Sequence, residues 1–291
     1  MRRMKFLVLF LLFFCHLDLS QSLDLSGLYR SLVRSQEEDD DPTHGFDPTK
    51  VTPVSWRPRA FIYNGFLSDE ECDHIINLAK GDLKKSQVAR DKTGESYLSD
   101  VRTSSGTFLK KEQDAIIKRI ENRISTWTFL PIENAEPIQV LRYGIGEKYE
   151  PHFDYFNDKK NIVWGGHRMV TVLMYLSNVT KGGETVFPNA EGVIQEKDDT
   201  WSDCSRRGLA VKPKKGDAVL FFSLHPDATT DPASLHASCP VIEGEKWSAP
   251  CWIHVGNRNT KVEMEDEPIK EKNDLHLTEP SSTNKTEKDE L

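Results

Sequence analysis

The chain has 291 residues, of which 37% are hydrophobic and 29% charged, a composition typical of a globular protein with polar appendages and room for one large or two small domains. The formal net charge of −8 argues against a general nucleic-acid-binding protein, whose binding surface would be basic, and we expect no nucleic-acid partner. Acidic residues gather at 37–41 and after 263, and such runs are usually solvated.

Residues 1–22 have the pattern of a secretory signal peptide. Basic residues at 2, 3 and 5 precede a ten-residue apolar run from Phe6 to Cys15, which is shorter than the roughly 20 residues of a membrane-spanning helix. Small residues at 20 and 22 favour cleavage after Ser22. An uncleaved type II membrane anchor is the alternative.

Residues 288–291 read Lys-Asp-Glu-Leu, the retrieval address of the endoplasmic reticulum. The address has meaning only in a chain that enters the secretory pathway, which the N-terminal segment predicts. We therefore expect a soluble protein of the endoplasmic reticulum lumen that binds the retrieval receptor. Asn178 and Asn284 begin glycosylation sequons; the tail makes Asn284 accessible, whereas the end of a strand-like run would shelter Asn178.

Residues 23–54 are polar and acidic, with little apolar periodicity, and predict a linker. A capping box at Ser68 and Glu71 then begins a helix. A second helix is expected from about Lys111 to Thr126. Each carries one apolar stripe at helical spacing, which predicts core packing: Cys72, Ile75, Ile76 and Ala79 in the first, and Ile116, Ile117, Ile120, Ile124 and Trp127 in the second.

Short runs typical of β-strands follow the helices, separated by Gly, Pro, Asp and Asn. They are Ile138–Tyr143, Met169–Leu176, Leu209–Lys212, Ala218–Phe222 and Trp252–Val255. Helices followed by several short strands predict an α+β domain, with a closed or double-sheet β core and helices on one side. Jelly rolls such as cupins fit this pattern. Residues 258–291 lack a core pattern and predict a disordered tail.

One set of residues has the types and spacing of a metal site. His152 and Asp154 would point to the same side of an extended segment, and His236 follows 82 residues after Asp154. Two imidazoles and one carboxylate on one face of a metal are typical of non-haem Fe(II) enzymes. His-x-Asp is common by chance, so the surroundings decide. Lys246 lies where such a site could hold the far carboxylate of 2-oxoglutarate.

Four segments carry a family resemblance. Residues 138–156 read IQVLRYGIGEKYEPHFDYF, residues 168–176 RMVTVLMYL, residues 182–188 GGETVFP and residues 234–254 SLHASCPVIEGEKWSAPCWIH. Together they resemble the catalytic domain of prolyl 4-hydroxylases, most closely the small plant and algal type, over residues 55–257. The resemblance implies a double-stranded β-helix (jelly-roll) core buttressed by the N-terminal helices.

The resemblance also implies roles for individual residues. His152, Asp154 and His236 would hold Fe(II), and Lys246, Tyr143 and Thr185 would bind 2-oxoglutarate. Arg168 and His254 match positions implicated in catalysis, and Trp252 matches one that lines the peptide pocket. Segment 86–109, which contains Arg102, resembles the mobile loop that closes over the peptide. Tyr155 and Phe156 are aromatics close enough in sequence to the ligands to help form the groove.

The expected reaction is 4-hydroxylation of peptidyl proline with O₂ and 2-oxoglutarate, with ascorbate as a further cofactor and release of succinate and CO₂. The substrates implied are proline-rich chains in polyproline II form, such as hydroxyproline-rich cell-wall glycoproteins, and no obligate disulfide-isomerase subunit is expected. A lysyl or prolyl 3-hydroxylase is the enzymatic alternative. A non-catalytic binder of proline-rich chains would predict loss of a metal ligand or of Lys246, and all four are present.

The four cysteines beyond the signal segment allow two disulfides in an oxidising compartment, with three possible pairings. Cys204 and Cys239 lie in segments that match the family, which favours their pairing. That choice leaves Cys72 with Cys251.

Overall fold

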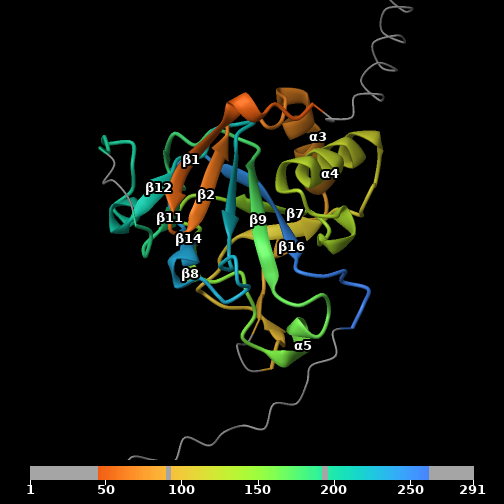
Figure 1. Cartoon of the computed structure of the whole chain (residues 1–291). Coiled ribbons are helices and arrows are strands. Elements are labelled where there is room, and N and C mark those ends of the chain that lie inside the picture. The colour runs from red at the N-terminus through yellow and green to blue at the C-terminus, as the bar shows by residue number, and fades with distance from the viewer. Residues whose placement is uncertain (1–44, 90–92, 192–195, 262–291) are drawn as a thin grey trace, which may run out of the picture.

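Two β-sheets face each other (Figure 1), and residues of both sheets line one cavity. The computed structural model describes residues 45–89, 93–191 and 196–261. The large sheet has the order β1 (Val51–Trp56), β2 (Arg59–Tyr63), β13 (Ala218–Phe222), β9 (Arg168–Tyr175), β16 (Lys246–His254), β7 (Gln139–Tyr143), β6 (Ser105–Phe108) and β3 (Lys84–Lys85). The small sheet has the order β12 (Leu209–Val211), β11 (Thr185–Phe187), β14 (His236–Ser238) and β8 (Tyr149–His152). This arrangement is the expected jelly roll.

Two short ribbons and the helices complete the described chain. β10 (Lys181–Gly182) pairs with β15 (Val241–Glu243), and β4 (Val88–Ala89) with β5 (Ser96–Tyr97). The helices are α3 (Asp69–Ala79), α4 (Ala115–Thr128) and the single turn α5 (Lys159–Ile162), with 3₁₀ turns η1 (Pro48–Lys50), η2 (Ile132–Asn134), η3 (Cys204–Arg207) and η4 (Pro232–Ser234). None of the helices in this part of the chain is long and apolar enough to cross a membrane.

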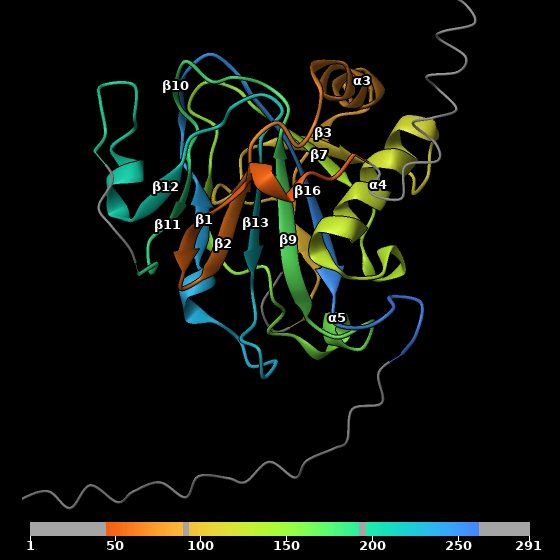
Figure 2. The same cartoon turned by 45° about the horizontal axis from the view of Figure 1, so that its top comes forward.

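The helices α3 and α4 cover the outer face of the large sheet, away from the small sheet (Figure 2). Strand residues alternate between faces, so one face of the large sheet packs against the helices and the other lines the cavity. On β9, Val170, Val172 and Met174 pack with the helices in the main core, whereas Thr171 and Leu173 line the cavity. The predicted fold, helices on one side of a β core, is confirmed.

Local signals set the helix boundaries. The capping box at Ser68 is present, with its hydroxyl accepting from the Glu71 amide at 3.2 Å and the Glu71 carboxylate accepting from the Ser68 amide at 3.0 Å. The second helix begins at Ala115 rather than near Lys111, because the Asp114 carboxylate accepts hydrogen bonds from the amides of Ile116 and Ile117 and so caps the first turn.

Strand β16 is longer than the predicted Trp252–Val255. A proline within a strand is unusual, because proline cannot donate to a ladder, and β16 contains Pro250. β16 pairs with β7 only from Lys246 to Ser248, so at Pro250 only β9 is a neighbour and the missing donor faces no partner strand. The first strand also begins earlier than expected, at Val51 within the predicted linker, where it pairs with Tyr63.

The cysteine prediction is half right. Cys204 and Cys239 form the expected disulfide, but Cys72 and Cys251 are both free and buried, so their predicted pairing is wrong. The sulfur of Cys72 lies 3.9 Å from the carbonyl oxygen of Tyr175, and Tyr175 pairs with Ser248, three residues along β16 from Cys251. Three residues of strand span about 10 Å, which is too far for a disulfide.

Candidate active site

The three predicted metal ligands lie together between the sheets. His152 ends β8 and His236 begins β14, and the two are paired across these antiparallel strands. Donor atoms of His152, Asp154 and His236 all lie within 4.8 Å of one another. The Nε2 atom of His152 is 3.7 Å from Oδ1 of Asp154, and that of His236 is 3.6 Å from Oδ2. This is the facial donor set of non-haem Fe(II) oxygenases, which leaves other positions open.

Backbone carbonyl groups orient both imidazole rings. The Nδ1 atoms of His152 and His236 lie 2.9 and 3.0 Å from the carbonyl oxygens of Glu150 and Ser234, respectively. Donation from Nδ1 leaves the lone pair of each Nε2 free for a metal. Burial lowers the pKa of His152 to about 3, so this ring is neutral at physiological pH, as a metal ligand must be.

Asp154 is held from the opposite sheet. The Thr171 hydroxyl, on β9, donates to Oδ2 of Asp154 at 2.7 Å. Burial alone would raise the pKa of Asp154, but its electrostatic interactions with His236, His152 and Arg168 and the hydrogen bond from Thr171 outweigh burial and lower the pKa. The carboxylate is therefore ionised and oriented before any metal arrives.

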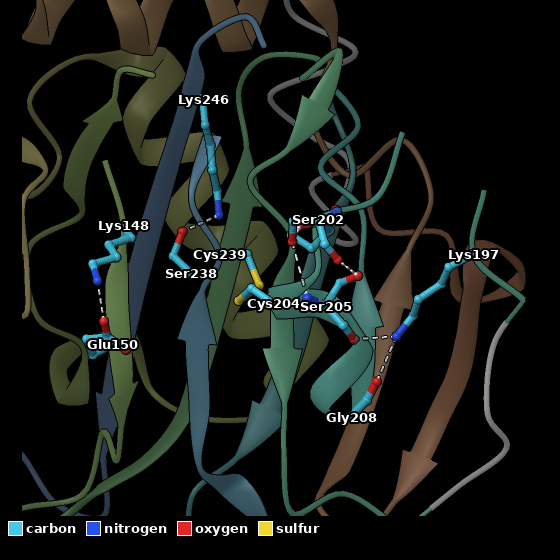
Figure 3. The surroundings of a disulfide bond; sticks show 11 residues. Lys148, Glu150, Lys197, Ser202, Cys204, Ser205, Gly208, Ser238, Cys239 and Lys246 are labelled. Carbon is cyan, nitrogen blue, oxygen red and sulfur yellow. Dashed lines mark hydrogen bonds and ion pairs between the residues drawn. A yellow bond between two sulfur atoms is a disulfide. The ribbon is translucent and has the colours of Figure 1, made fainter. Parts of the chain in front are cut away.

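A buried lysine of β16 reaches the end of β14. Lys246 is 1% exposed, and its Nζ donates to the Ser238 hydroxyl at 2.8 Å (Figure 3). The same nitrogen lies 5.3 Å from the ring centre of Tyr143. In the described ranges no Asp or Glu forms an ion pair with it. A buried ammonium group without a carboxylate partner is costly unless an anionic ligand supplies one.

The other two predicted cosubstrate residues lie around Lys246. Thr185, on β11, is paired with Ser238 of β14, and its hydroxyl accepts from the Tyr175 hydroxyl at 2.8 Å. Tyr143, on β7, is paired with Lys246. Burial raises the pKa of Tyr143, so its phenol stays protonated and can donate to a carboxylate.

One cavity joins the metal ligands to Lys246. Its walls come from both sheets: Arg102, Leu141, Tyr143, Tyr149, His152, Asp154, Thr171, Leu173, Thr185, Phe221, His236, Ala237, Ser238, Lys246, Ser248, Pro250 and Trp252. The metal-donor set at one part of the cavity fits Fe(II). Lys246, at another part, fits one carboxylate of a dicarboxylate such as 2-oxoglutarate, so the cavity can hold both ligands together.

Sequence comparison decides the family. Residues 138–254 match the model of the 2OG-Fe(II) oxygenase superfamily. The chain is 66% identical over 211 residues to probable prolyl 4-hydroxylase 6 of Arabidopsis thaliana, covering 72% of this chain and 73% of that protein. It is 62% identical over 218 residues to prolyl 4-hydroxylase 2 of the same plant, covering 74% and 73%. This chain is a prolyl 4-hydroxylase family member.

A solved structure is also similar to this family member. The viral collagen prolyl hydroxylase vCPH of Paramecium bursaria Chlorella virus-1, in its 2OG complex, is 28% identical, with a TM-score of 0.49, over 67% of this chain and 94% of that one.

Arg168 of this prolyl 4-hydroxylase family member faces a wider groove that continues from the cavity. Its guanidinium donates to both carboxylate oxygens of Glu136, at 2.7 and 3.1 Å, and lies 4.1 Å from the Trp252 ring centre. Burial would raise the pKa of Glu136, but Arg168 and His254 outweigh it and hold the pKa below its usual range. Arg168 is thus fixed in a charged, oriented state beside the metal ligands.

His254 lies behind this arrangement. It is buried, its Nε2 is 2.9 Å from Glu136 and its Nδ1 is 3.0 Å from the Gly166 carbonyl oxygen. It lines neither the cavity nor the groove. Regular alternation along β16 would put His254 on the same face as Trp252, but the register shifts after Ile253. Its predicted catalytic role stays a prediction, and its geometry is that of a residue that positions Arg168 through Glu136.

The predicted peptide-binding residues all line the groove. The indole nitrogen of Trp252 is buried and has no hydrogen-bond partner among the described residues. Arg102 lies 4.7 Å over the Tyr149 ring. Tyr155 stacks on Phe153 at 4.6 Å between ring centres.

Sequence reasoning missed four supporting residues of this site. Thr171, Ser238 and Tyr175 hold Asp154, Lys246 and Thr185, and Glu136 joins Arg168 to His254. Period two identifies Ser238, two residues after His236 on the same strand. The other three depend on contacts between segments that are distant in sequence, for which the local pattern holds no signal.

Proposed function

We propose that this protein hydroxylates C4 of peptidyl proline with O₂ and 2-oxoglutarate, acting on hydroxyproline-rich cell-wall glycoproteins. The observation that carries the proposal is the joint geometry of one cavity. Donor atoms of His152, Asp154 and His236 lie within 4.8 Å of one another, and the buried Lys246, which has no carboxylate partner among the described residues, lies beside Ser238 at the end of β14.

The residues of the chain prepare this chemistry in three ways. His152, Asp154 and His236 would hold Fe(II), which would activate O₂ as the oxidant, with one oxygen atom passing to the C–H bond to give C–OH and the other to succinate as 2-oxoglutarate loses CO₂. Lys246 would bind the distal carboxylate of 2-oxoglutarate. Apolar walls, Leu173 and Phe221 among them, exclude water, which strengthens these charged contacts.

A polypeptide substrate suits the unpartnered donors near the metal ligands. A polyproline II chain has no internal hydrogen bonds, so its carbonyl groups are free to accept. The Trp252 indole N–H and the Arg102 Nε–H are both buried without partners in the described part of the chain, and both residues line the groove. We infer that they donate to substrate carbonyl groups. The relatives are named prolyl 4-hydroxylases of a plant, Arabidopsis thaliana, and hydroxyproline-rich cell-wall glycoproteins are the substrates that the family resemblance implies.

The remaining expectations are part of the same proposal. Ascorbate would keep the iron reduced, and the enzyme would act without an obligate disulfide-isomerase subunit in the endoplasmic reticulum lumen.

The targeting segments at 1–22 and 288–291 and the sequon Asn284 lie outside the described residues. Asn178, the other sequon, is exposed on the surface rather than sheltered, with its side chain accepting from the Lys215 amide at 2.9 Å.

The direct test is incubation with Fe(II), 2-oxoglutarate, ascorbate and a proline-rich peptide, followed by mass spectrometry and amino-acid analysis. We expect the gain of one oxygen atom as 4-hydroxyproline. Hydroxylysine or 3-hydroxyproline would favour the alternative oxygenase functions, and binding without turnover would favour a non-catalytic binder.

Ligand variants make the test specific to the site. Each of His152→Ala, Asp154→Ala and His236→Ala should abolish turnover and weaken metal binding, because three ligands leave little redundancy. The matched control is His225→Ala, which removes a histidine that lines neither the cavity nor the groove. Near-wild-type turnover in any ligand variant, with iron in excess, removes that residue from the metal site.

A further inference from the structure

The groove extends well beyond the metal ligands, over strands that the small sheet does not face. It continues from Trp252 and Tyr149 across β7 and β6 to β3, where Gln139, Gly106, Phe108 and Lys84 line it. The small sheet ends at β8, whereas β6 and β3 form the edge of the large sheet. The inner face of these edge strands is therefore open to a long ligand.

Strand register places Phe108 on this inner face. Leu141 and Tyr143 of β7 line the cavity, and period two puts Gln139 on the same side. Cross-strand partners share a face, and Phe108 is paired with Gln139 as Gly106 is with Leu141. A Cβ atom on Gly106 would lie 2.7 Å from the Leu141 side chain. Glycine therefore fits at this position, and no side chain of residue 106 projects into the groove.

Phe108 is an exposed aromatic ring at the end of the groove. It is 54% exposed, although a phenylalanine on a sheet face would ordinarily be covered. A chain of contacts joins it to the metal end: Arg102 lies over Tyr149 and donates to Gln139 at 2.9 Å, and Gln139 is the strand partner of Phe108. The floor between the two ends is thus polar, with an aromatic surface at each end.

We propose that Phe108 forms a distal subsite that packs against a proline ring remote from the one being hydroxylated. The inference rests on the proposed function. Proline-rich chains dock on aromatic-lined grooves, because the polyproline II helix presents ring faces at regular intervals. The N–H groups of Trp252 and Arg102 would bind the substrate backbone near the iron ligands. Phe108 would contact a proline ring further along the same substrate chain. The enzyme therefore prefers long proline-rich segments to short ones.

The test is the KM of a series of proline peptides of increasing length, measured with Phe108→Ala, Phe108→Trp and the wild type. Loss of one aromatic contact should raise the KM of long peptides about 3- to 10-fold. Short peptides that do not reach β6 should keep their KM, and the KM for 2-oxoglutarate should stay unchanged. Phe108→Trp should retain the preference for long peptides. Phe129→Ala is the matched control, since Phe129 is 89% exposed and lies outside the groove.

Two results would overturn the subsite. One is an equal KM for long peptides in Phe108→Ala and the wild type, and the other is an equal rise for short and long peptides. Failure of the proposed function looks different, because the wild type would then hydroxylate no proline peptide of any length. Fluorescence polarisation of a labelled proline-rich peptide reads the subsite without turnover, and the same loss is expected there in Phe108→Ala.

Discussion

At the scale of single residues, the charge of Lys246 depends on what shares its cavity. Burial lowers its pKa to about 7, although the negative charge of Glu184 opposes the shift. Only the ammonium form attracts a carboxylate. Below pH 7 the amine of the free enzyme is already charged, whereas above pH 7 binding of 2-oxoglutarate must be accompanied by uptake of a proton.

This linkage predicts a pH-dependent affinity. The Kd of 2-oxoglutarate should be nearly constant below pH 7 and should rise about tenfold per pH unit above it, until the pKa of the bound state is reached. Anaerobic calorimetry with the Mn(II)-loaded enzyme between about pH 6 and 9 measures it. In Lys246→Arg the guanidinium stays charged throughout, so the slope should disappear. If the Kd of Lys246→Arg rises with pH as steeply as that of the wild type, the proton taken up on binding belongs to another group.

A second prediction concerns the contact itself. Lys246→Ala removes the partner of a buried carboxylate, a loss of roughly 2–5 kcal/mol, or about 30- to several-thousand-fold in binding. The apparent KM for 2-oxoglutarate should rise by this factor while the KM for peptide changes little. Lys246→Arg keeps the charge but has a different length and shape, so we expect partial rescue at best. An unchanged 2-oxoglutarate KM in Lys246→Ala contradicts the assignment.

At the scale of elements, the disulfide ties η3 to the end of β14. Cys239 directly follows Ser238, the partner of Lys246 (Figure 3). For a sequence separation of 35 residues, the chain-entropy model gives about 3–4 kcal/mol of stabilisation. The double variant Cys204→Ser/Cys239→Ser should lose this much in urea unfolding. Its KM for 2-oxoglutarate should also rise, because β14 loses an anchor beside Ser238.

The matched control for this variant is the wild type in reducing agent, which should lose the same stability. Cys72 and Cys251 are already free thiols, so reduction adds nothing at those positions. A double variant that is as stable as the oxidised wild type contradicts a structural role for this bond.

The elements also show which parts of the fold the sequence predicts. The helices α3 and α4 were predictable, because a cap and an apolar stripe lie within one short segment. The small-sheet strands β8, β11 and β14 were not among the predicted strands, because three or four residues carry too little periodicity. Their residues nevertheless include the metal ligands His152 and His236, which motif reasoning found without the strands. The bulge that turns His254 and the distance between Cys72 and Cys251 are set by tertiary packing alone.

At the scale of the whole molecule, the proposed ligands would connect the two sheets. His152 and His236 belong to the small sheet, whereas Thr171, which holds Asp154, belongs to the large one. Lys246 lies on the large sheet and Thr185 on the small one. A metal with 2-oxoglutarate would therefore contact both sheets of the jelly roll. Separation of the two sheets on unfolding would require release of the metal and of 2-oxoglutarate.

Thermal unfolding measures this coupling for the entire domain. A ligand at about 100 times its Kd stabilises the folded state by about 2.7 kcal/mol, which for a domain of this size raises Tm by about 5–10 °C. We expect Mn(II) alone to raise Tm, and Mn(II) with 2-oxoglutarate to raise it further. Lys246→Ala should keep the metal shift and lose the 2-oxoglutarate shift at the same concentrations, whereas His152→Ala should lose both, because 2-oxoglutarate binds at the metal as well as at the lysine. A 2-oxoglutarate shift that persists in both variants would mean that the dicarboxylate binds elsewhere.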